Sequence, residues 1–213
     1  MARDGFDPAV LRAAYDAIAP EYAEKFGGDL DRLELDTDLL GRMAAAAAGG
    51  LVLDVGCGPA HAGAYLAARG VRVLGVDLSV AMLASAAGRH CGLGLRVACA
   101  DLRHLPVRSH CCAGVTLFYV LHHLPREDLP LALAELGRVL APGGALLLAT
   151  HEGTGEFVAD DHPDIKGTLY SGAELDRALT GAGFGGVQVR RRDPLPHERP
   201  SGRVYVTATA YPR

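Results

Sequence analysis

The segment from Leu51 to Pro59 constrains the fold of this chain more than any other. It starts with the apolar run Leu-Val-Leu-Asp-Val, which is typical of a buried strand. Gly56 and Gly58 follow, and residues without a Cβ atom allow the backbone to turn sharply and to approach a ligand. The N–H groups at the start of the next helix are suited to a carboxylate or a phosphate. We therefore predict a strand, a glycine turn and a helix that together hold a small charged ligand.

The rest of the chain is consistent with one α/β unit. From Leu51 to Thr150, strand-like and helix-like stretches alternate, which implies a parallel sheet. A helix is expected over Pro8–Glu24, with a break or kink at Pro20. The other expected elements are a helix at Asp29–Ala48, a loop at His151–Tyr170, a helix at Ser171–Ala182, and antiparallel strands near Val187–Arg191 and Arg203–Ala210.

Two further strands end on acids. The strand Val71–Val76 runs into Asp77, about 20 residues past the glycine turn, where a carboxylate is placed to accept hydrogen bonds from ribose hydroxyls. The alternative for Asp77 is a role in capping the helix that starts near Ser79. The next strand, Val97–Ala100, is followed by Asp101. Since ligands bind at the carboxyl ends of the strands in open α/β sheets, these acids are expected at one site.

The wording Leu-Asp-Val-Gly-Cys-Gly-Pro at 53–59 resembles the first motif of class I S-adenosylmethionine-dependent methyltransferases. Similar segments follow in order at 71–79, 97–102, 114–125 and 136–149, and the resemblance extends from about Tyr15 to the C-terminus. It implies a Rossmann-like methyltransferase fold with a seven-stranded mixed sheet, helices on both faces and an N-terminal helical lid. The expected single domain, 1–213, comprises a lid (1–48), a cofactor-binding core (49–150), and a substrate loop with the C-terminal strands (151–213).

The resemblance also implies S-adenosyl-L-methionine as the cofactor. Asp77 would hold its ribose, Asp101 the amino group of adenine, and Leu102 the adenine ring through its backbone N–H. Tyr15 and Tyr22 would close over the cofactor, the alternative being that both pack as aromatic residues at the rim. The full expected cofactor set is Tyr15, Tyr22, Asp54, Gly56, Cys57, Gly58, Asp77, Leu78, Met82, Asp101, Leu102 and Phe118.

Two histidines are the candidate catalytic residues. His151 comes one residue after the fifth strand, where it could act as a general base or a substrate anchor, or merely form a hydrogen bond at the rim. His123 lies in the segment His122-His123-Leu124-Pro125, which many members of the resembled family share regardless of substrate; this favours a positioning role over base catalysis. An ion pair between Glu198 and Arg203 is a further expectation, the alternative being two solvated charges.

No metal site is expected. The cysteines are Cys57, Cys91, Cys99, Cys111 and Cys112; they form no C-x-x-C pair, and we expect reduced thiols, with Cys99 buried in a strand. Zinc at 110–123 is disfavoured because the ligand spacing fits no closed tetrahedral site. The acids of the 151–170 loop, including Asp160 and Asp161, could hold Mg²⁺, but their irregular spacing favours a solvated loop.

Charge and composition restrict the partners. A net charge of −4 does not favour binding to nucleic acid or to an anionic membrane, and no apolar run is long enough for a membrane span. A cytosolic protein acting on a small organic acceptor (O-, N- or C-methylation) is the leading interpretation, and the oligomeric state is open between a monomer and a homodimer. The rival functions are binding of S-adenosylmethionine without methyl transfer, and a nicotinamide-dependent oxidoreductase. The second is disfavoured because His61 stands where G-x-G-x-x-G requires its third glycine.

Overall fold

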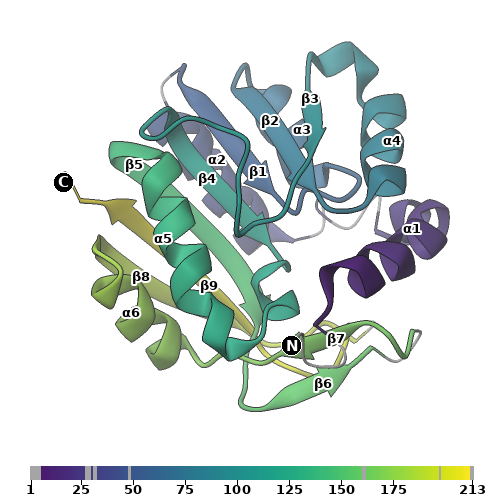
Figure 1. Ribbon diagram of the computed structural model, residues 1–213. Helices are drawn as coiled ribbons and strands as arrows, with labels where there is room; N and C mark the ends of the chain where they lie inside the picture. The colour runs from purple at the N-terminus through teal and green to yellow at the C-terminus, as the bar shows by residue number, and fades with distance from the viewer. Residues whose placement is uncertain are drawn as a thin grey trace.

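A single large sheet separates two sets of helices in the computed structural model (Figure 1). The structure describes residues 6–26, 30, 33–47, 49–159, 162–196 and 198–211. The helices are α1 (Pro8–Lys25), α2 (Glu34–Ala47), α3 (His61–Ala67), α4 (Val80–Arg89), α5 (Leu129–Val139) and α6 (Gly172–Gly181), with 3-10 turns η2 (Cys91–Leu93), η3 (Leu121–His123) and η4 (Arg126–Asp128). The strands are β1 (Leu51–Val55), β2 (Arg72–Asp77), β3 (Arg96–Cys99), β4 (Cys112–Phe118), β5 (Leu140–His151), β6 (Glu156–Val158), β7 (Lys166–Thr168), β8 (Phe184–Arg192) and β9 (Arg203–Ala210).

The sheet confirms the predicted seven-stranded mixed arrangement. Its strand order is β3-β2-β1-β4-β5-β9-β8. The first five of these strands are parallel neighbours, whereas β9 pairs antiparallel with both β5 and β8. The carboxyl ends of β3, β2, β1 and β4 therefore lie at one edge of the sheet, as the strand-end acids required.

Helix starts follow from local side-chain chemistry. Asp7 precedes α1 and accepts a hydrogen bond from the N–H of Ala9 at 2.7 Å, while Pro8 occupies a first-turn position that needs no donor. Ser79 caps α4 by accepting from the N–H of Met82 at 3.1 Å. Because α4 starts directly after β2, this cap fixes the turn that carries Asp77.

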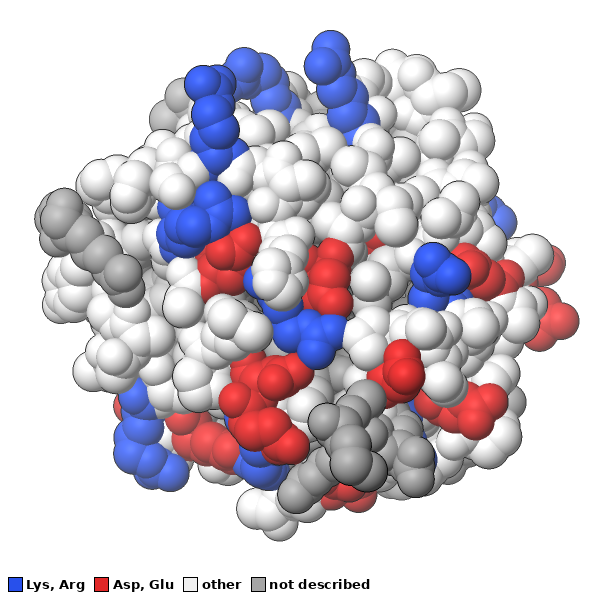
Figure 2. All heavy atoms as spheres, in the orientation of Figure 1, with Lys and Arg blue, Asp and Glu red and all other residues white. Residues whose placement is uncertain are grey.

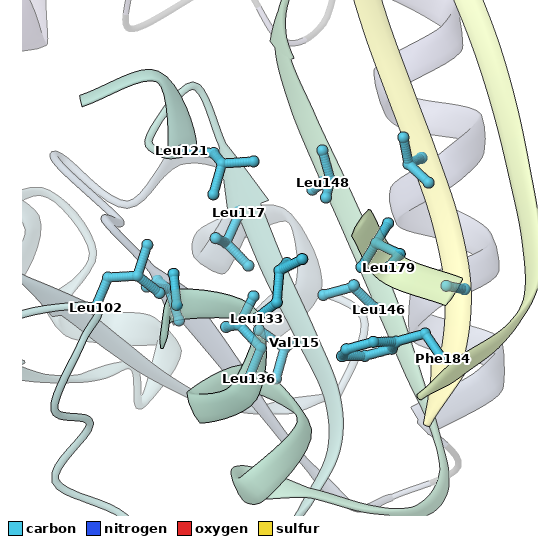
Figure 3. Close-up of a cluster of buried hydrophobic side chains, with 14 of the residues drawn as sticks. Leu102, Val115, Leu117, Leu121, Leu133, Leu136, Leu146, Leu148, Leu179 and Phe184 are labelled. Atoms are coloured by element: carbon cyan, nitrogen blue, oxygen red, sulfur yellow. The ribbon is translucent and has the colours of Figure 1, made fainter. Parts of the chain in front are cut away.

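The core fills both faces of the sheet. On one face, α5 and α6 pack against β4, β5 and β9, and Figure 3 shows Leu133, Leu136 and Leu179 directed toward Val115 and Leu146. On the other face, α2 and α3 cover β1, β2 and β5 through a second apolar cluster. Strands that are apolar on both sides read as continuous hydrophobic runs, which explains why the segments 51–55 and 115–117 were recognisable.

The expected helix at Pro8–Glu24 is confirmed as α1, which ends at Lys25, and it is continuous through Pro20, so the break expected there as one alternative does not occur. Two other expectations were wrong. The 151–170 region is not only loop, since β6 and β7 form an antiparallel hairpin there. Strand β5 begins at Leu140, ahead of the Pro-Gly-Gly that was expected to separate helix from strand, and a register shift in the β4–β5 pairing accommodates the extra residues of β5.

Two smaller corrections concern single positions. Helix α2 begins at Glu34; Asp29 and Ala48, the expected ends, lie outside the described residues. Cys99 is exposed rather than buried, because β3 is the edge strand of the sheet.

Helix α1 and the β6–β7 hairpin lie over the carboxyl edge of the sheet (Figure 1). Helix α1 packs beside α4, and β7 packs on η3. On the face shown in Figure 2, the upper edge carries basic side chains, whereas basic and acidic side chains lie together across the middle and lower parts. Within the described ranges, no helix combines the length and apolar character needed to cross a membrane.

Candidate functional site

A crevice of about 880 Å³, including its open mouth, lies at the carboxyl ends of the central strands. Its wall brings together residues from α1, from the turns after β1 to β4, and from η3. Of the predicted site residues, the crevice is lined by Tyr15, Tyr22, Gly56, Gly58, Asp77, Leu78, Met82, Asp101, Leu102, Phe118 and His123.

The glycine turn after β1 has two constraints of different kinds. Gly56 has a φ of 61°, and a Cβ atom built on it would lie 2.1 Å from Cγ2 of Val120. Gly58 has a φ of 51°, but a Cβ atom there would meet no heavy atom within 4 Å. Gly56 is therefore required by the packing of the protein, whereas Gly58 leaves free space beside the backbone at the crevice wall.

Asp77 connects the glycine turn to the start of α4. One of its carboxylate oxygens accepts from the N–H of Gly58 at 2.8 Å, and the other accepts from the N–H of Ser79 at 2.8 Å. Its burial raises the pKa of the carboxyl group, and these backbone donors act in the opposite direction. The alternative role near the helix start is thus present, and the same carboxylate also faces the crevice.

Asp54 and Cys57 do not line the crevice, although both belong to the predicted cofactor set. Asp54 is 2% exposed and accepts from the hydroxyl of Thr116 at 2.8 Å and from the N–H of Gly63 at 3.0 Å. Burial raises the pKa of Asp54 to about 6. Burial likewise raises the pKa of the Cys57 thiol. These two residues support the turn from behind.

The carboxylate of Asp101 is held by Arg103, two residues later in the chain. The guanidinium of Arg103 forms two hydrogen bonds to the carboxylate of Asp101, 3.0 Å from Nε to Oδ1 and 2.6 Å from Nη2 to Oδ2. The N–H of Arg103 also donates to Oδ1, at 2.8 Å. Although burial alone would raise it, the pKa of Asp101 is lowered, because Arg103 stabilises the charged form.

Two adjacent residues of α1, Tyr15 and Asp16, form hydrogen bonds with the site. Asp16 accepts from the hydroxyl of Ser79 at 2.6 Å and from the N–H of Ala81 at 3.0 Å, and these bonds lower the pKa of Asp16. The hydroxyl of Tyr15 lies 2.8 Å from Nε2 of His123. Sequence reasoning missed Asp16, although its place beside Tyr15 on the expected lid was a usable signal.

The histidines lie in a chain of rings. The rings of His122 and His123 have centroids 4.0 Å apart, and His122 lies 5.1 Å from His151. Burial lowers the pKa of His123 to about 4 and that of His151 to about 3, with Arg203 and Arg199 adding to the effect on His151. Nδ1 of His151 lies 3.0 Å from the hydroxyl oxygen of Ser201, and His151 itself does not line the crevice.

Tyr119 links these histidines to a buried polar network that the sequence did not reveal. It lines the crevice with a φ of 58°, an uncommon value for a bulky residue, and its ring lies 5.5 Å from that of His151. Its hydroxyl lies 3.3 Å from that of Tyr205, which donates to Asp36 at 2.8 Å.

The predicted contact of Glu198 with Arg203 is present at 3.6 Å, but Arg192 binds Glu198 more closely, at 2.7 and 2.8 Å.

Comparison with known proteins identifies the family. Residues 52–144 match the profile of a methyltransferase domain. The chain is 34% identical to a demethylmenaquinone methyltransferase of Thermobifida fusca over 67% of this chain and 61% of that protein, and 32% identical to a malonyl-[acyl-carrier protein] O-methyltransferase of Dechloromonas aromatica over 68% of this chain and 56% of that protein. The DhpI–SAH complex superposes with a TM-score of 0.74 at 25% identity, covering 100% of both chains.

The chain belongs to the class I S-adenosylmethionine-dependent methyltransferase family. The resemblance of 53–59 to the family's first motif is thereby confirmed, and S-adenosyl-L-methionine is the cofactor. A phosphoethanolamine N-methyltransferase 2 of Haemonchus contortus shares the fold at a TM-score of 0.78 with 17% identity, over 97% of this chain and 60% of that one. The chain spans less than two thirds of the length of the two curated methyltransferase relatives compared above.

The residues of the methyltransferase crevice fit this cofactor. The open space beside Gly58 gives room for the amino-acid tail at the turn. Carboxylates at the ends of two adjacent strands, Asp77 and Asp101, can accept from a sugar diol and from an exocyclic amine. Leu78, Met82 and Phe118 supply apolar contact area in the same wall. Among the described residues, no group of three or more His, Cys, Asp or Glu is arranged to hold a metal ion; the acids Asp160 and Asp161 lie outside them.

Proposed function

We propose that this protein transfers the methyl group of S-adenosyl-L-methionine to a small organic acceptor. The observation that carries the proposal is one continuous crevice that contains two strand-end carboxylates, Asp77 and Asp101, at one part and the Tyr15–His123 pair at another. The first part suits the nucleoside, and the second lies where the turn after β4 meets the lid. Names of relatives support the reaction class, since two of them are methyltransferases acting on small or carrier-bound acceptors.

The cofactor would be held from three sides. Asp77 would accept from the ribose hydroxyls with lone pairs that Gly58 and Ser79 leave available. Asp101 would accept from the adenine amino group, with Leu102 against the ring. Tyr15 and Tyr22, whose ring centroids are 6.0 Å apart in an edge-to-face arrangement, would cover the open side.

Catalysis would rest mainly on positioning. When bound, the cofactor supplies an electrophilic methyl group on a sulfonium. The residues of this chain would align a nucleophile behind that methyl group and exclude water, with Phe118 and Tyr119 as walls. Positioning of this kind contributes up to about 7–11 kcal/mol to the lowering of a barrier.

His123 would act by orienting Tyr15. Its Nδ1 lies 3.1 Å from the carbonyl oxygen of Lys166, which can only accept, so Nδ1 carries the proton and Nε2 accepts from Tyr15. A pKa of about 4 makes His123 a weak base. The Tyr15–His123 pair is therefore suited to fixing an acceptor that reacts through a lone pair or as an anion, rather than to removing a proton of high pKa.

His151 would act through Tyr119. With a pKa of about 3 and no place in the crevice wall, His151 is poorly suited to the role of general base. Its ring supports that of Tyr119, which faces the crevice. The roles of general base and of direct substrate anchor both require a place in the crevice wall, whereas the contact with Ser201 corresponds to the third alternative for His151, a hydrogen bond at the rim.

The character of the acceptor follows from the crevice wall. Most side chains of the crevice wall are aromatic or apolar, its arginines are Arg12 and Arg103, and its acidic residues in the described chain are Asp77 and Asp101, which the cofactor would use. A cationic amine would find no carboxylate of its own there. We therefore propose an uncharged or anionic acceptor with a flat, conjugated ring.

The division of the chain follows the same logic. Residues 1–48 would form the lid, 49–150 the cofactor-binding core, and 151–213 the acceptor side. A cytosolic location, and the choice between monomer and homodimer, remain predictions from the sequence. Binding to nucleic acid is not favoured by the net charge of −4.

The test has two stages. Thermal unfolding with S-adenosylhomocysteine should show a raised midpoint, whereas NAD should leave the midpoint unchanged. Methyl transfer from radiolabelled cofactor should then be measured against 2-naphthol, 1,4-naphthohydroquinone, benzoate and ethanolamine, with the aromatic compounds expected to accept. Stabilisation by NAD would favour the oxidoreductase, and tight cofactor binding without turnover on a broad acceptor panel would favour a binding protein.

A further inference from the structure

Arg103 is a crevice residue that neither the sequence analysis nor the family motif assigned. It lies in the loop after β3, lines the crevice beside Asp101 and Leu102, and is only 19% exposed in its side chain. Arg103 forms an ion pair with Asp101, the carboxylate proposed to bind the cofactor. Arginine suits the position because its planar guanidinium can grip a carboxylate with two parallel bonds.

The contacts leave Asp101 with little spare acceptor capacity. A carboxylate offers about four lone-pair sites, two on each oxygen. Oδ1 of Asp101 accepts from the backbone N–H and the Nε of Arg103, and Oδ2 accepts from Nη2. Three of the about four sites are thus occupied, and the one that remains is on Oδ2.

Arg103 is itself fixed from the opposite side. Its Nη1 lies 2.7 Å from Oδ2 of Asp128, the residue that ends η4 and precedes α5. The carboxylate of Asp101 is therefore tied through Arg103 to the start of a helix that packs in the main core. Such a link restricts rotation of the Asp101 side chain about its Cα–Cβ and Cβ–Cγ bonds.

We propose that Arg103 is a positioning residue for the cofactor purine, which fixes the Asp101 carboxylate so that a single oxygen site accepts one N–H from an amino group at purine C6. This inference rests on the proposed role of Asp101. A fixed acceptor selects for an amino group and against a 6-oxo group, because two acceptors facing each other leave both without a donor. A carboxylate free to turn would discriminate less.

Isothermal titration of the full chain tests this with two ligands, S-adenosylhomocysteine and its 6-oxo analogue S-inosylhomocysteine. In Arg103→Gln we expect S-adenosylhomocysteine to bind about tenfold more weakly, and the preference for it over the 6-oxo analogue to narrow by a similar factor. Arg103→Lys should not restore either value, because an ammonium cannot make the two parallel bonds. Arg42→Gln, which removes an exposed arginine paired with Asp38, is the matched control and should bind both ligands as the wild type does.

Asp128→Asn provides a second variant that leaves the bonds between Arg103 and Asp101 in place. It should weaken S-adenosylhomocysteine binding by a smaller factor, about threefold, since only the tether is lost. The inference would be overturned if Arg103→Gln bound S-adenosylhomocysteine as tightly as the wild type and kept the same preference over the 6-oxo analogue. Full recovery of affinity and preference in Arg103→Lys would overturn it as well. Failure of the wild-type protein to bind S-adenosylhomocysteine would instead overturn the proposed function, and the inference with it.

Discussion

The hydroxyl of Tyr15 donates a hydrogen bond to Nε2 of His123, 2.8 Å away, and so joins α1 to the turn that follows β4. The other ring nitrogen, Nδ1, donates to the carbonyl of Lys166 in β7. One neutral imidazole thereby connects the N-terminal helix and the β6–β7 hairpin, the two elements that lie over the carboxyl edge of the sheet (Figure 1). Protonation of His123 would remove the acceptor that Tyr15 uses.

The free energy of unfolding should therefore fall at acid pH. The folded-state pKa of His123, about 4, is below its ordinary value of 6.5, so the unfolded chain binds a proton first as the pH falls. Stability is fully present above pH 6.5 and is lost as the pH falls toward 4. Between pH 7.5 and pH 4.5, the free energy of unfolding should fall by about 2–3 kcal/mol less in His123→Gln than in the wild type, as measured by urea unfolding.

His104→Gln is the control for this pH dependence, because His104 is exposed. The buried carboxyl of Asp54 has a raised pKa and the opposite sign, but it is common to all three proteins and does not affect their differences. Equal pH dependence in the wild type and His123→Gln would show that His123 is not held neutral in the folded protein.

Two glycine substitutions should separate the structural from the ligand-binding part of the turn after β1. Gly56→Ala places a Cβ against Val120 and should destabilise the fold by more than about 2 kcal/mol. Gly58→Ala meets no atom of the protein, so only the strain of its φ, about 1–2 kcal/mol, should reduce stability. Its methyl group should nevertheless weaken S-adenosylhomocysteine binding at least about tenfold, measured by titration calorimetry. Unimpaired binding by Gly58→Ala would exclude this turn as the place of the amino-acid tail.

Asp77→Ala should weaken the binding of S-adenosylhomocysteine by about 1.5–3 kcal/mol, the size expected for hydrogen bonds to a charged group. The variant also removes the acceptor for the N–H groups of Gly58 and Ser79, so part of the loss will come from the turn itself. Asp38→Ala, which changes an exposed acid on α2, should bind normally. Calorimetric affinity that is the same in Asp77→Ala as in the wild type would refute the ribose assignment.

Thr116→Val tests the support behind the turn. Thr116 is fully buried and donates to Asp54, so the isosteric valine leaves a buried carboxylate without one of its donors. We expect a loss of about 1–3 kcal/mol in the free energy of unfolding at pH 8. The loss should shrink below pH 6, where Asp54, with its pKa already raised to about 6, becomes protonated. Thr180→Val, at an exposed position, should change the free energy of unfolding little. If the loss in Thr116→Val did not change with pH, the role of Asp54 would be contradicted.

His151→Ala should lower turnover while leaving cofactor affinity nearly intact, since His151 supports the ring of Tyr119 and lies outside the crevice wall. His151→Phe, which retains a ring, should recover a good part of the turnover if packing is the reason. Equal loss of turnover and of S-adenosylhomocysteine affinity in His151→Ala would mean that His151 supports the cofactor site instead. Turnover is to be measured with whichever acceptor the radiolabelled assay identifies.

Much of the fold could be predicted because its signals are local. The glycine turn and the acids at the ends of β2 and β3 follow from short runs of sequence, and parallel strands bring such ends together by geometry alone. The extent of β5 could not be read in this way. Its pairing at Leu140 depends on a register shift in its pairing with β4, which is distant in sequence, so the sheet overrides the Pro-Gly-Gly signal.

The site was predictable to the same degree. Asp77 and Gly58 were found because each lies in a motif with a mechanism. Arg103 and Tyr119 were missed because their importance comes from contacts with distant residues, Asp128 in one case and Tyr205 in the other. No spacing rule in a single sequence announces such pairs.

The position of β9 between β5 and β8 has a consequence for biosynthesis. Strand β8 leaves the ribosome before β9, yet β8 has no partner in the sheet until β9 has arrived. The free edge of β5 is therefore exposed to other nascent chains until residue 210 has been translated, and native pairing on that side must wait for synthesis to pass that point.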